Sequence, residues 1–223
     1  MKHLFLIAAL FFAMNLYAAP PKVPFSSDQY TIALWHFDEN SGDSVFDASG
    51  HGNSGKIYGA QWVQGEFGSA LQFDGTDSVK VLDNPSLHLQ TVTVEAWIYS
   101  DNFMADYFGV IVSKEYGNMA SFRLQNYNMT GGITFVTNSN WGNEVTSFQP
   151  LQNQAWHCVA GVSSNGYLKV YVDGILVASG QRNSLRGPLN IVLNAYVLSS
   201  YCFYQGFVRY RLCGKAGLHE PVK

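Results

Sequence analysis

The fold class is decided by one stretch of nine residues, Thr91-Val-Thr-Val-Glu-Ala-Trp-Ile-Tyr99. Its even-numbered residues, from Val92 to Ile98, are all apolar, whereas its odd-numbered residues mix polar and aromatic side chains. An apolar pattern with a period of two is typical of a β-strand that buries one face. Because aromatic residues also stand on the second face, we expect both faces of this strand to be at least partly covered.

A β-hairpin is predicted further along the chain, where the alternating run from Tyr167 to Val172 meets Asp173-Gly174 and then Ile175-Leu-Val177. Asp-Gly tolerates the positive φ angles of a type I′ turn, which joins adjacent antiparallel strands. No amphipathic helical period of useful length occurs. Many short strands without helices indicate two packed sheets or a closed barrel, and further strands are expected at residues 30–37, 69–73, 78–82, 108–114, 120–127, 132–138 and 156–163.

Two segments near the start favour the packed sheets, namely Ala33-Leu-Trp-His-Phe-Asp-Glu-Asn-Ser-Gly42 and Phe46-Asp-Ala-Ser-Gly-His-Gly-Asn-Ser-Gly55. They closely resemble the opening of the laminin G-like jelly rolls. Further matching motifs follow in the family's order: Gly68-Ser-Ala-Leu-Gln-Phe-Asp-Gly75, Ser78-Val-Lys-Val81, Pro85-Ser-Leu87, Thr93-Val-Glu-Ala-Trp-Ile98, Trp156-His-Cys-Val-Ala160 and Leu168-Lys-Val-Tyr-Val-Asp-Gly174.

The resemblance covers about residues 30–191 and implies an all-β, two-sheet antiparallel jelly-roll sandwich of the concanavalin A-like type. Trp35, Trp97 and Trp156 are expected in the core between the sheets. Members of this family are often accessory or adhesion modules, and some hold calcium. Sandwiches of this architecture serve as lectins, receptors and hydrolases, so the resemblance leaves the function to be argued from the site.

The N-terminus has the pattern of a secretory signal peptide, in which Lys2 and His3 precede an apolar run closed by Ala18 and Ala19. The run is shorter than the roughly 20 apolar residues of a membrane-spanning helix. We therefore expect a secreted, extracellular or periplasmic protein without a membrane span. The predicted organisation is a signal peptide over 1–19, a linker over 20–29, a laminin G-like domain over 30–212 that diverges after about 191, and a tail over 213–223.

The charge of the chain argues against nucleic acid as a partner, because the formal net charge is −3 and no basic footprint is present. Cys158, in an alternating run, is expected to act as a small buried hydrophobic residue. Cys202 and Cys213 could pair in an oxidising compartment. No cysteine–histidine spacing indicates a zinc site.

The hypothesis of an enzyme can be tested on the spacing of the acidic residues, because related sandwich hydrolases place two acids close together on one strand face. A retaining mechanism needs the two carboxyl groups about 5–5.5 Å apart. The acids of this chain are scattered, no Glu-x-Asp run occurs, and Glu95 is the only acid on its strand. No Gly-x-Ser-x-Gly motif is present either. The sequence therefore predicts a noncatalytic protein, with a glycan-active hydrolase as the alternative.

Calcium is the cofactor that the sequence suggests, with Asp38, Asp47 and Asn53 as candidate oxygen ligands in glycine-containing loops. The competing interpretation is that Asp38 and Asp47 cap tight turns through Asx-type hydrogen bonds. In family members with the metal, an acid from the final strand often completes the site. This chain has no Asp or Glu between Gly174 and His219, which weakens the calcium hypothesis.

A glycan site needs an aromatic platform for the apolar sugar face and amides or carboxylates for the hydroxyl groups. Residues 138–143 have that composition, with Trp141 flanked by Asn140 and Asn143. Tyr116, Asn126 and Tyr127 are further candidates in neighbouring segments, although any of these aromatic residues could simply cover a loop. We therefore expect a secreted noncatalytic module that binds a glycan or an extracellular protein, the latter as a structural adhesion protein.

The C-terminal segment departs from the family after about residue 191 and becomes basic, with Arg209, Arg211 and Lys215. Two explanations remain open: ordinary divergence, or a frame change in the coding sequence. We favour divergence and expect Gly206-Phe-Val-Arg-Tyr-Arg-Leu212 to form the closing strand, because Phe207 and Val208 can cover the core and their neighbours favour strands.

Overall fold

The computed structural model describes residues 24–105, 109–116, 119–127, 130–137, 143–181, 195–198 and 202–211, with the backbone alone for 115, 116, 119, 120, 195–198 and 202–211. Several predicted features therefore lie outside the described residues: the signal peptide, Asn140, Trp141, the side chain of Tyr116 and the pairing of Cys202 with Cys213. Within the described residues, no helix has the length and apolar character needed to cross a membrane.

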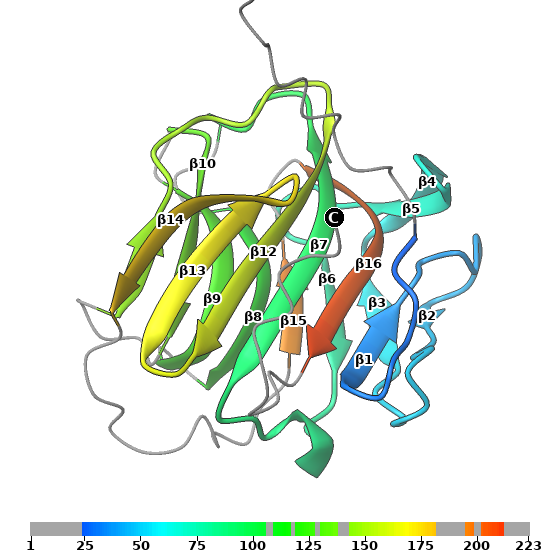
Figure 1. The fold of residues 1–223 in the computed structure, drawn as a ribbon. Coiled ribbons are helices and arrows are strands. Elements are labelled where there is room, and N and C mark those ends of the chain that lie inside the picture. The colour runs from blue at the N-terminus through cyan, green and yellow to red at the C-terminus, as the bar shows by residue number, and fades with distance from the viewer. Residues whose placement is uncertain are drawn as a thin grey trace, which may run out of the picture.

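The chain forms two antiparallel sheets packed face to face, which confirms the predicted jelly-roll sandwich (Figure 1). The first sheet has the order β14-β13-β12-β7-β16-β5-β4, with β1 paired to β16, and the second has the order β11-β10-β9-β8-β15-β6-β3-β2. The elements are β1 Thr31–Trp35, β2 Ser44–Val45, β3 Gly55–Tyr58, β4 Gln61–Gly65, β5 Gly68–Gln72, β6 Ser78–Val81, η1 Pro85–Leu87, β7 Val92–Ser100, β8 Val110–Tyr116, β9 Met119–Tyr127, β10 Gly132–Thr137, β11 Glu144–Thr146, β12 Trp156–Ser164, β13 Tyr167–Val172, β14 Ile175–Gln181, β15 Ala195–Leu198 and β16 Cys202–Arg211.

The strand that decided the fold class, β7, lies at the centre of the first sheet. Its apolar face, from Val92 to Ile98, is buried in the core between the sheets. The two sheets approach closely at Gly161 of β12, where an added Cβ would lie 2.3 Å from the ring of Phe135 in β10. Interiors are packed too densely to absorb such a contact, so a glycine is required there.

The second face of β7 is also covered, as predicted, but the tryptophans do not all lie where they were expected. Trp35 belongs to the core between the sheets. Trp97 forms a separate cluster with Leu34, and Trp156 packs against that cluster. The expectation that Trp97 and Trp156 fill the central core was wrong, because both stand on the outer face of the first sheet, opposite the apolar residues of β7.

The predicted hairpin forms between β13 and β14, with Val172 opposite Ile175. Asp173 and Gly174 have φ angles of 50° and 78°, as a type I′ turn requires. The Asp173 carboxylate also accepts the backbone N–H of Cys158 at 2.9 Å. Cys158 is half-buried and packs against the cluster of Leu34 and Trp97.

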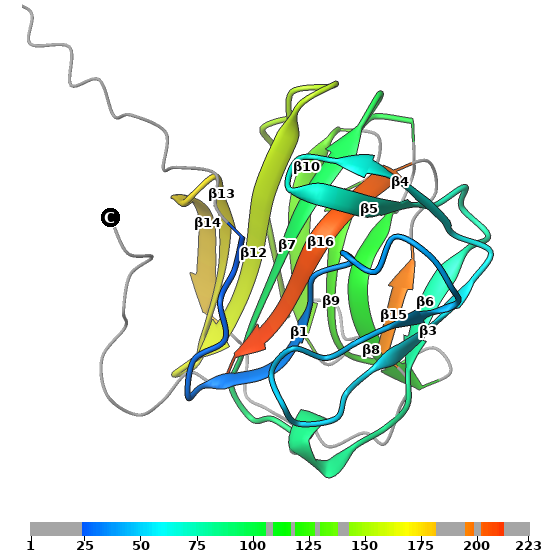
Figure 2. The same cartoon turned by 90° about the vertical axis from the view of Figure 1, so that its right-hand side faces the viewer.

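The closing strand forms as expected: β16 pairs with both β7 and β1, and its first residues pair with β5. Figure 2 shows β16 running between β7 and the β4–β5 hairpin, which lies beside its upper end. The register shifts between Gln205 and Arg209, where β16 bulges. The sequence pattern did not predict β2, β3, β4, β11 and β15, which are short strands of two to five residues.

Candidate functional site

A hollow of about 540 Å³ opens at one end of the sandwich, where β5 and β7 end and β4 begins. We call it the rim hollow. Six of its nine lining residues have polar side chains, and the full set is Gly59, Gln61, Gln72, Phe73, Asp74, Asp77, Asp101, Asn102 and Ala105. Ligand sites are typically such concave surfaces with a few convergent polar groups.

One row of cross-strand partners runs along the first sheet into the rim hollow. Trp156 pairs with Tyr99, the backbone of Phe203 pairs with both Tyr99 and Gln72, and Gln72 pairs with Gln61. Directly opposed residues share a face of the sheet. The rings of Tyr99 and Trp156 are 5.4 Å apart, centroid to centroid, with planes inclined at 45°. Aromatic side chains therefore stand in line with two exposed glutamines that line the hollow.

Three carboxylates line the same hollow, and each uses one oxygen in hydrogen bonds. Asp74 Oδ1 accepts the backbone N–H and the hydroxyl of Thr76 at 2.9 and 2.8 Å. Asp77 Oδ2 accepts the backbone N–H of Asp74 at 3.0 Å. Asp101 Oδ1 accepts the Tyr99 hydroxyl at 3.3 Å. An ionised carboxylate can accept about four hydrogen bonds, so each keeps capacity for a ligand.

Protonation in the hollow follows from these contacts. The hydrogen bonds from Thr76, foremost its backbone N–H, hold the pKa of Asp74 below its ordinary value of 3.8. Partial burial, followed by the charge of Asp101, raises the pKa of the Tyr99 hydroxyl above its ordinary value of 10.0. At neutral pH the lining residue Asp74 is therefore ionised, and the Tyr99 hydroxyl, which donates to the lining residue Asp101, is protonated.

The loop after β7, which carries Asp101 and Asn102, is fixed by the buried ring of Phe103. The backbone N–H of Phe103 donates to Asn153 Oδ1 at 2.9 Å, and its carbonyl accepts from Asn126 Nδ2. The ring meets the imidazole of His157 edge-on at 5.9 Å. His157 is held in turn by Asp173, with Nδ1 2.8 Å from Oδ2. The geometry of the hollow is thus set by groups outside it.

Of the residues predicted to bind a glycan, those that the structure describes do not meet in one place. Asn126 and Tyr127 pair with the start of β10, whereas Asn143 lies beyond its other end and accepts the backbone N–H of Thr137 at 2.9 Å. The backbone of Tyr116 lies at the other end of β9 from Tyr127. Asn126 and Asn143 are buried, at 4% and 8% exposure. Tyr127 is partly exposed, and its ring lies 5.9 Å from that of Phe148, centroid to centroid.

The candidate calcium ligands differ in how far their oxygens are already hydrogen-bonded. Asp47 uses both oxygens, because Oδ1 accepts the amides of Leu34 and Ser49 at 3.0 and 2.8 Å and Oδ2 accepts that of Asn53 at 2.9 Å. The bond from Ser49 is an Asx-type turn, as the competing interpretation held. Asp38 is exposed. Among the residues that the structure describes, no group of three or more His, Cys, Asp or Glu side chains could hold a metal ion.

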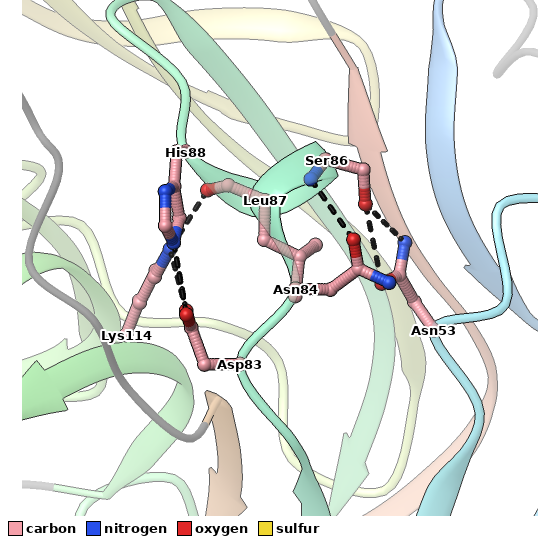
Figure 3. A network of polar contacts seen from close by, with 7 residues as sticks. All are labelled: Asn53, Asp83, Asn84, Ser86, Leu87, His88 and Lys114. Carbon is pink, nitrogen blue, oxygen red and sulfur yellow. Dashed lines mark hydrogen bonds and ion pairs between the residues drawn. The ribbon is translucent and has the colours of Figure 1, made fainter.

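Asn53 is buried and belongs to a polar network around η1 (Figure 3). Because η1 precedes β7 whereas Asp101 and Asn102 of the rim hollow follow it, the network and the hollow lie at opposite ends of this strand. Asn53 Nδ2 donates to the carbonyl of Ile32 and to Ser86 Oγ at 2.8 and 3.0 Å, and its Oδ1 accepts the Ser86 hydroxyl at 3.3 Å. Its backbone carbonyl accepts the indole N–H of Trp35 at 2.7 Å. With these oxygens engaged, Asp47 and Asn53 do not fit a ready calcium site, and calcium binding stays a prediction.

Figure 3 shows a second part of the same network, centred on Asp83. His88 Nε2 lies 3.0 Å from both Asp83 oxygens. Lys114 is buried at 1% exposure, donates to the carbonyl of Leu87 at 2.8 Å and lies 3.7 Å from Asp83. Burial lowers the pKa of Lys114 from its ordinary value of 10.5, although the charge of Asp83 acts the other way. This network ties η1 to β8 and the 43–55 segment.

The sequence pattern missed the rim hollow because its residues come from three separate segments, 59–61, 72–77 and 101–105. One local signal existed: Phe73-Asp-Gly-Thr-Asp77 places two acids in a turn directly after a buried strand. The register that aligns Trp156, Tyr99 and Gln72 depends on strand pairing, which no local pattern reports.

A family model matches residues 73–191 of the chain and is described as that of the concanavalin A-like lectin/glucanases superfamily. No curated protein matches the sequence.

Among solved structures, the botulinum neurotoxin serotype C1 binding domain has a TM-score of 0.64 at 13% identity, covering 83% of this chain and 50% of that one. The binding domain of botulinum neurotoxin DC in complex with rat synaptotagmin II has a TM-score of 0.63 at 14% identity, covering 81% and 48%. Domain 4 of an extracellular arabinanase from Geobacillus stearothermophilus, in complex with arabinotriose, has a TM-score of 0.62 at 16% identity, covering 80% and 94%. At these identities the likeness shows the fold, and the chain spans about half the length of the toxin domains it matches.

Proposed function

From the premise that this chain belongs to the concanavalin A-like lectin/glucanases superfamily, we propose that it is a noncatalytic module that binds a carbohydrate in the rim hollow. The single observation that carries the proposal is the register row that joins the Tyr99–Trp156 aromatic pair to Gln72 and Gln61 at the hollow. Several solved structures of similar fold are binding domains, and one is an arabinanase domain in complex with arabinotriose.

The chemistry of this row suits a sugar. One face of a pyranose or furanose ring is apolar and packs on an aromatic side chain. Its hydroxyl groups both donate and accept, which matches carboxylate acceptors such as Asp101 and side-chain amides such as Gln72. Hydrogen bonds to an ionised acceptor are stronger than those between neutral groups.

Binding without cleavage fits the carboxylates of the hollow. A glycosidase needs one carboxylic acid that stays protonated near neutral pH, which requires a raised pKa. The pKa of Asp74 is shifted in the opposite direction by hydrogen bonds from Thr76. Glu95, the acid considered from the sequence, pairs in register with Ala160 and with Arg209 of β16, on neighbouring strands of the first sheet. Export of the module, to an extracellular or periplasmic location, is supported by the N-terminal pattern.

The test is a glycan array followed by titration calorimetry with the best oligosaccharide. Gln72→Ala and Tyr99→Ala should each weaken binding, the latter by about 1–3 kcal/mol if stacking on a sugar resembles stacking on a base. Phe148→Ala, which removes an exposed ring elsewhere, is the matched control and should leave the affinity unchanged. Trp141→Ala tests the rival location in residues 138–143, and a loss there alone would move the site.

Protein binding is a second candidate function, favoured by an apolar patch at residues 104, 131, 148 and 150. Phe148 and Met104 are 70% and 45% exposed, and an added Cβ at Gly131 would lie 3.2 Å from Pro150 and 3.4 Å from Met104. Exposed apolar groups that gather in this way mark interaction sites. Loss of an extracellular protein partner in Phe148→Asp, with glycan binding intact, would support this function.

A further inference from the structure

We infer that the rim hollow takes uncharged sugars and rejects sugars that carry a carboxylate or sulfate. This inference rests on the proposed function and names the chemical class of its ligand. It follows from the charges that face the hollow, together with the amides and the aromatic row that make the hollow suitable for a sugar.

The lining is one-sided in charge. Three of its nine residues are aspartates, and none is Lys, Arg or His. The cation on neighbouring β6, Lys80, is directed elsewhere, with Nζ 5.5 Å from the centroid of the Tyr58 ring. Lys56 on β3 pairs with Asp43 at 3.3 Å. The described lining therefore offers an acidic sugar no countercharge.

The Asp74 and Asp77 carboxylates are held in place by hydrogen bonds from backbone N–H groups. Asp74 and Asp77 close one turn, since each accepts a hydrogen bond from a residue of that turn. Gly59 makes room for Asp77, because an added Cβ at this glycine would lie 1.9 Å from Asp77 Oδ1. Acidic oxygens fixed in this way cannot swing aside to admit a second anion.

Repulsion of this kind acts as selection against a wrong ligand. At about 6 Å, in surroundings between water and a protein surface, one like charge weakens binding on the order of threefold to a hundredfold. Three carboxylates at one hollow should therefore discriminate by at least about tenfold, and added salt should reduce the discrimination because exposed charges are screened.

The experiment uses pairs of oligosaccharides that differ only at C6: tetragalactose with tetragalacturonate, tetraglucose with tetraglucuronate, and tetramannose with tetramannuronate. Each is titrated against the mature protein at low and high salt. We expect at least one neutral member to bind and its acidic partner to bind at least tenfold more weakly. Asp101→Asn should narrow the difference from both sides, because it removes one like charge that repels the acidic probe and one ionised acceptor that binds the neutral probe.

The outcomes separate this inference from the proposed function. Equal binding of both members of a pair, with both lost in Tyr99→Ala, would overturn the charge selection and keep the carbohydrate site. Acidic binding that exceeds neutral binding would overturn it as well. If no neutral or acidic probe binds, the proposed function fails and this inference fails with it. Thermal unfolding of each variant shows whether a lost affinity reflects a lost fold.

Discussion

Two acidic regions at opposite ends of the sandwich use their carboxylates differently. In the 47–53 turn, both oxygens of Asp47 accept hydrogen bonds, from three backbone amides in total, and Asn53 is buried. In the rim hollow, Asp74, Asp77 and Asp101 each use one oxygen for hydrogen bonds and line an open space. Both regions look alike in sequence, as acids among glycines and serines.

The difference teaches that the hydrogen bonds already made by a polar loop residue decide whether it stabilises a turn or can bind a ligand. Where both carboxylate oxygens accept hydrogen bonds from backbone N–H groups, the residue stabilises a turn, and a ligand would have to break those hydrogen bonds. Where an oxygen remains beside a concave surface, the residue can serve a ligand without loss of structure. Four substitutions or conditions probe this contrast, from the largest expected effect to the smallest.

The largest effect is expected on stability at Asp47. Asp47→Ala removes the partner of three backbone amides, each worth about 1 kcal/mol net, so the free energy of unfolding should fall by about 3 kcal/mol. Asp101→Ala, in the rim hollow, should change it by less than about 0.5 kcal/mol, as exposed substitutions usually do. Urea unfolding of both variants is the measurement, and equal losses would remove the distinction between the two regions.

Two glycines with positive φ provide the next test, one in each region. Gly59 and Gly52 have φ angles of 85° and 78°, but an added Cβ meets Asp77 only at Gly59 and nothing within 4 Å at Gly52. Both changes to alanine should cost about 1 kcal/mol of stability through backbone strain. Only Gly59→Ala should also lower glycan affinity, by about tenfold, because it displaces Asp77. Equal affinity in the two variants would show that Asp77 is not a ligand-binding group.

Calcium should have a smaller effect, since the oxygens of the 47–53 turn are engaged. When calcium is present at about 100 times its Kd, binding to one site raises the free energy of unfolding by about 2.7 kcal/mol. In a chain of this length, that increase raises the unfolding midpoint by about 5–10 °C. We expect a rise well below that on changing from chelator to millimolar calcium. A rise of this size, abolished in Asp47→Asn, would establish the calcium site that the sequence suggested.

The smallest effect is the pH dependence from Asp74. Because its pKa is lowered on folding, its contribution to stability is fully present above its ordinary pKa of 3.8 and is lost as the pH falls through the lowered value. Asp74→Asn should therefore flatten the acid limb of stability below about pH 4 and leave it unchanged in shape near neutrality. An unchanged acid limb in this variant would mean that the bonds from Thr76 do not favour the ionised form.

The sequence predicted correctly those elements whose structure depends on adjacent residues. The alternation in residues 91–99 and the Asp173-Gly174 turn predicted β7 and the β13–β14 hairpin because strand period and turn geometry depend on adjacent residues. The family motifs supplied the two-sheet architecture. The pattern failed for Trp97 and Trp156, since which face of a strand is the inner one depends on the partner sheet.

The candidate site was less accessible to sequence reasoning because it arises from register between distant strands. Composition directed attention to amide and aromatic residues near positions 116–143, yet the structure buries Asn126 as a support of Phe103. Gln72 and Tyr99 become candidate binding residues only because both pair with Phe203 of β16, which places them in one row. The loop with Asn140 and Trp141 lies outside the described residues, so its role stays a prediction.

The most direct test of the central claim, that the rim hollow binds a carbohydrate, is a titration of the nitrogen-15-labelled protein with the best neutral oligosaccharide, followed by chemical-shift mapping. We expect the largest shifts at the side-chain amides of Gln61 and Gln72 and at the backbone of Asp101 and Asn102. The 47–53 turn should remain unperturbed. Shifts confined to residues 138–143, or to the apolar patch around Phe148, would contradict the account and place the binding site elsewhere.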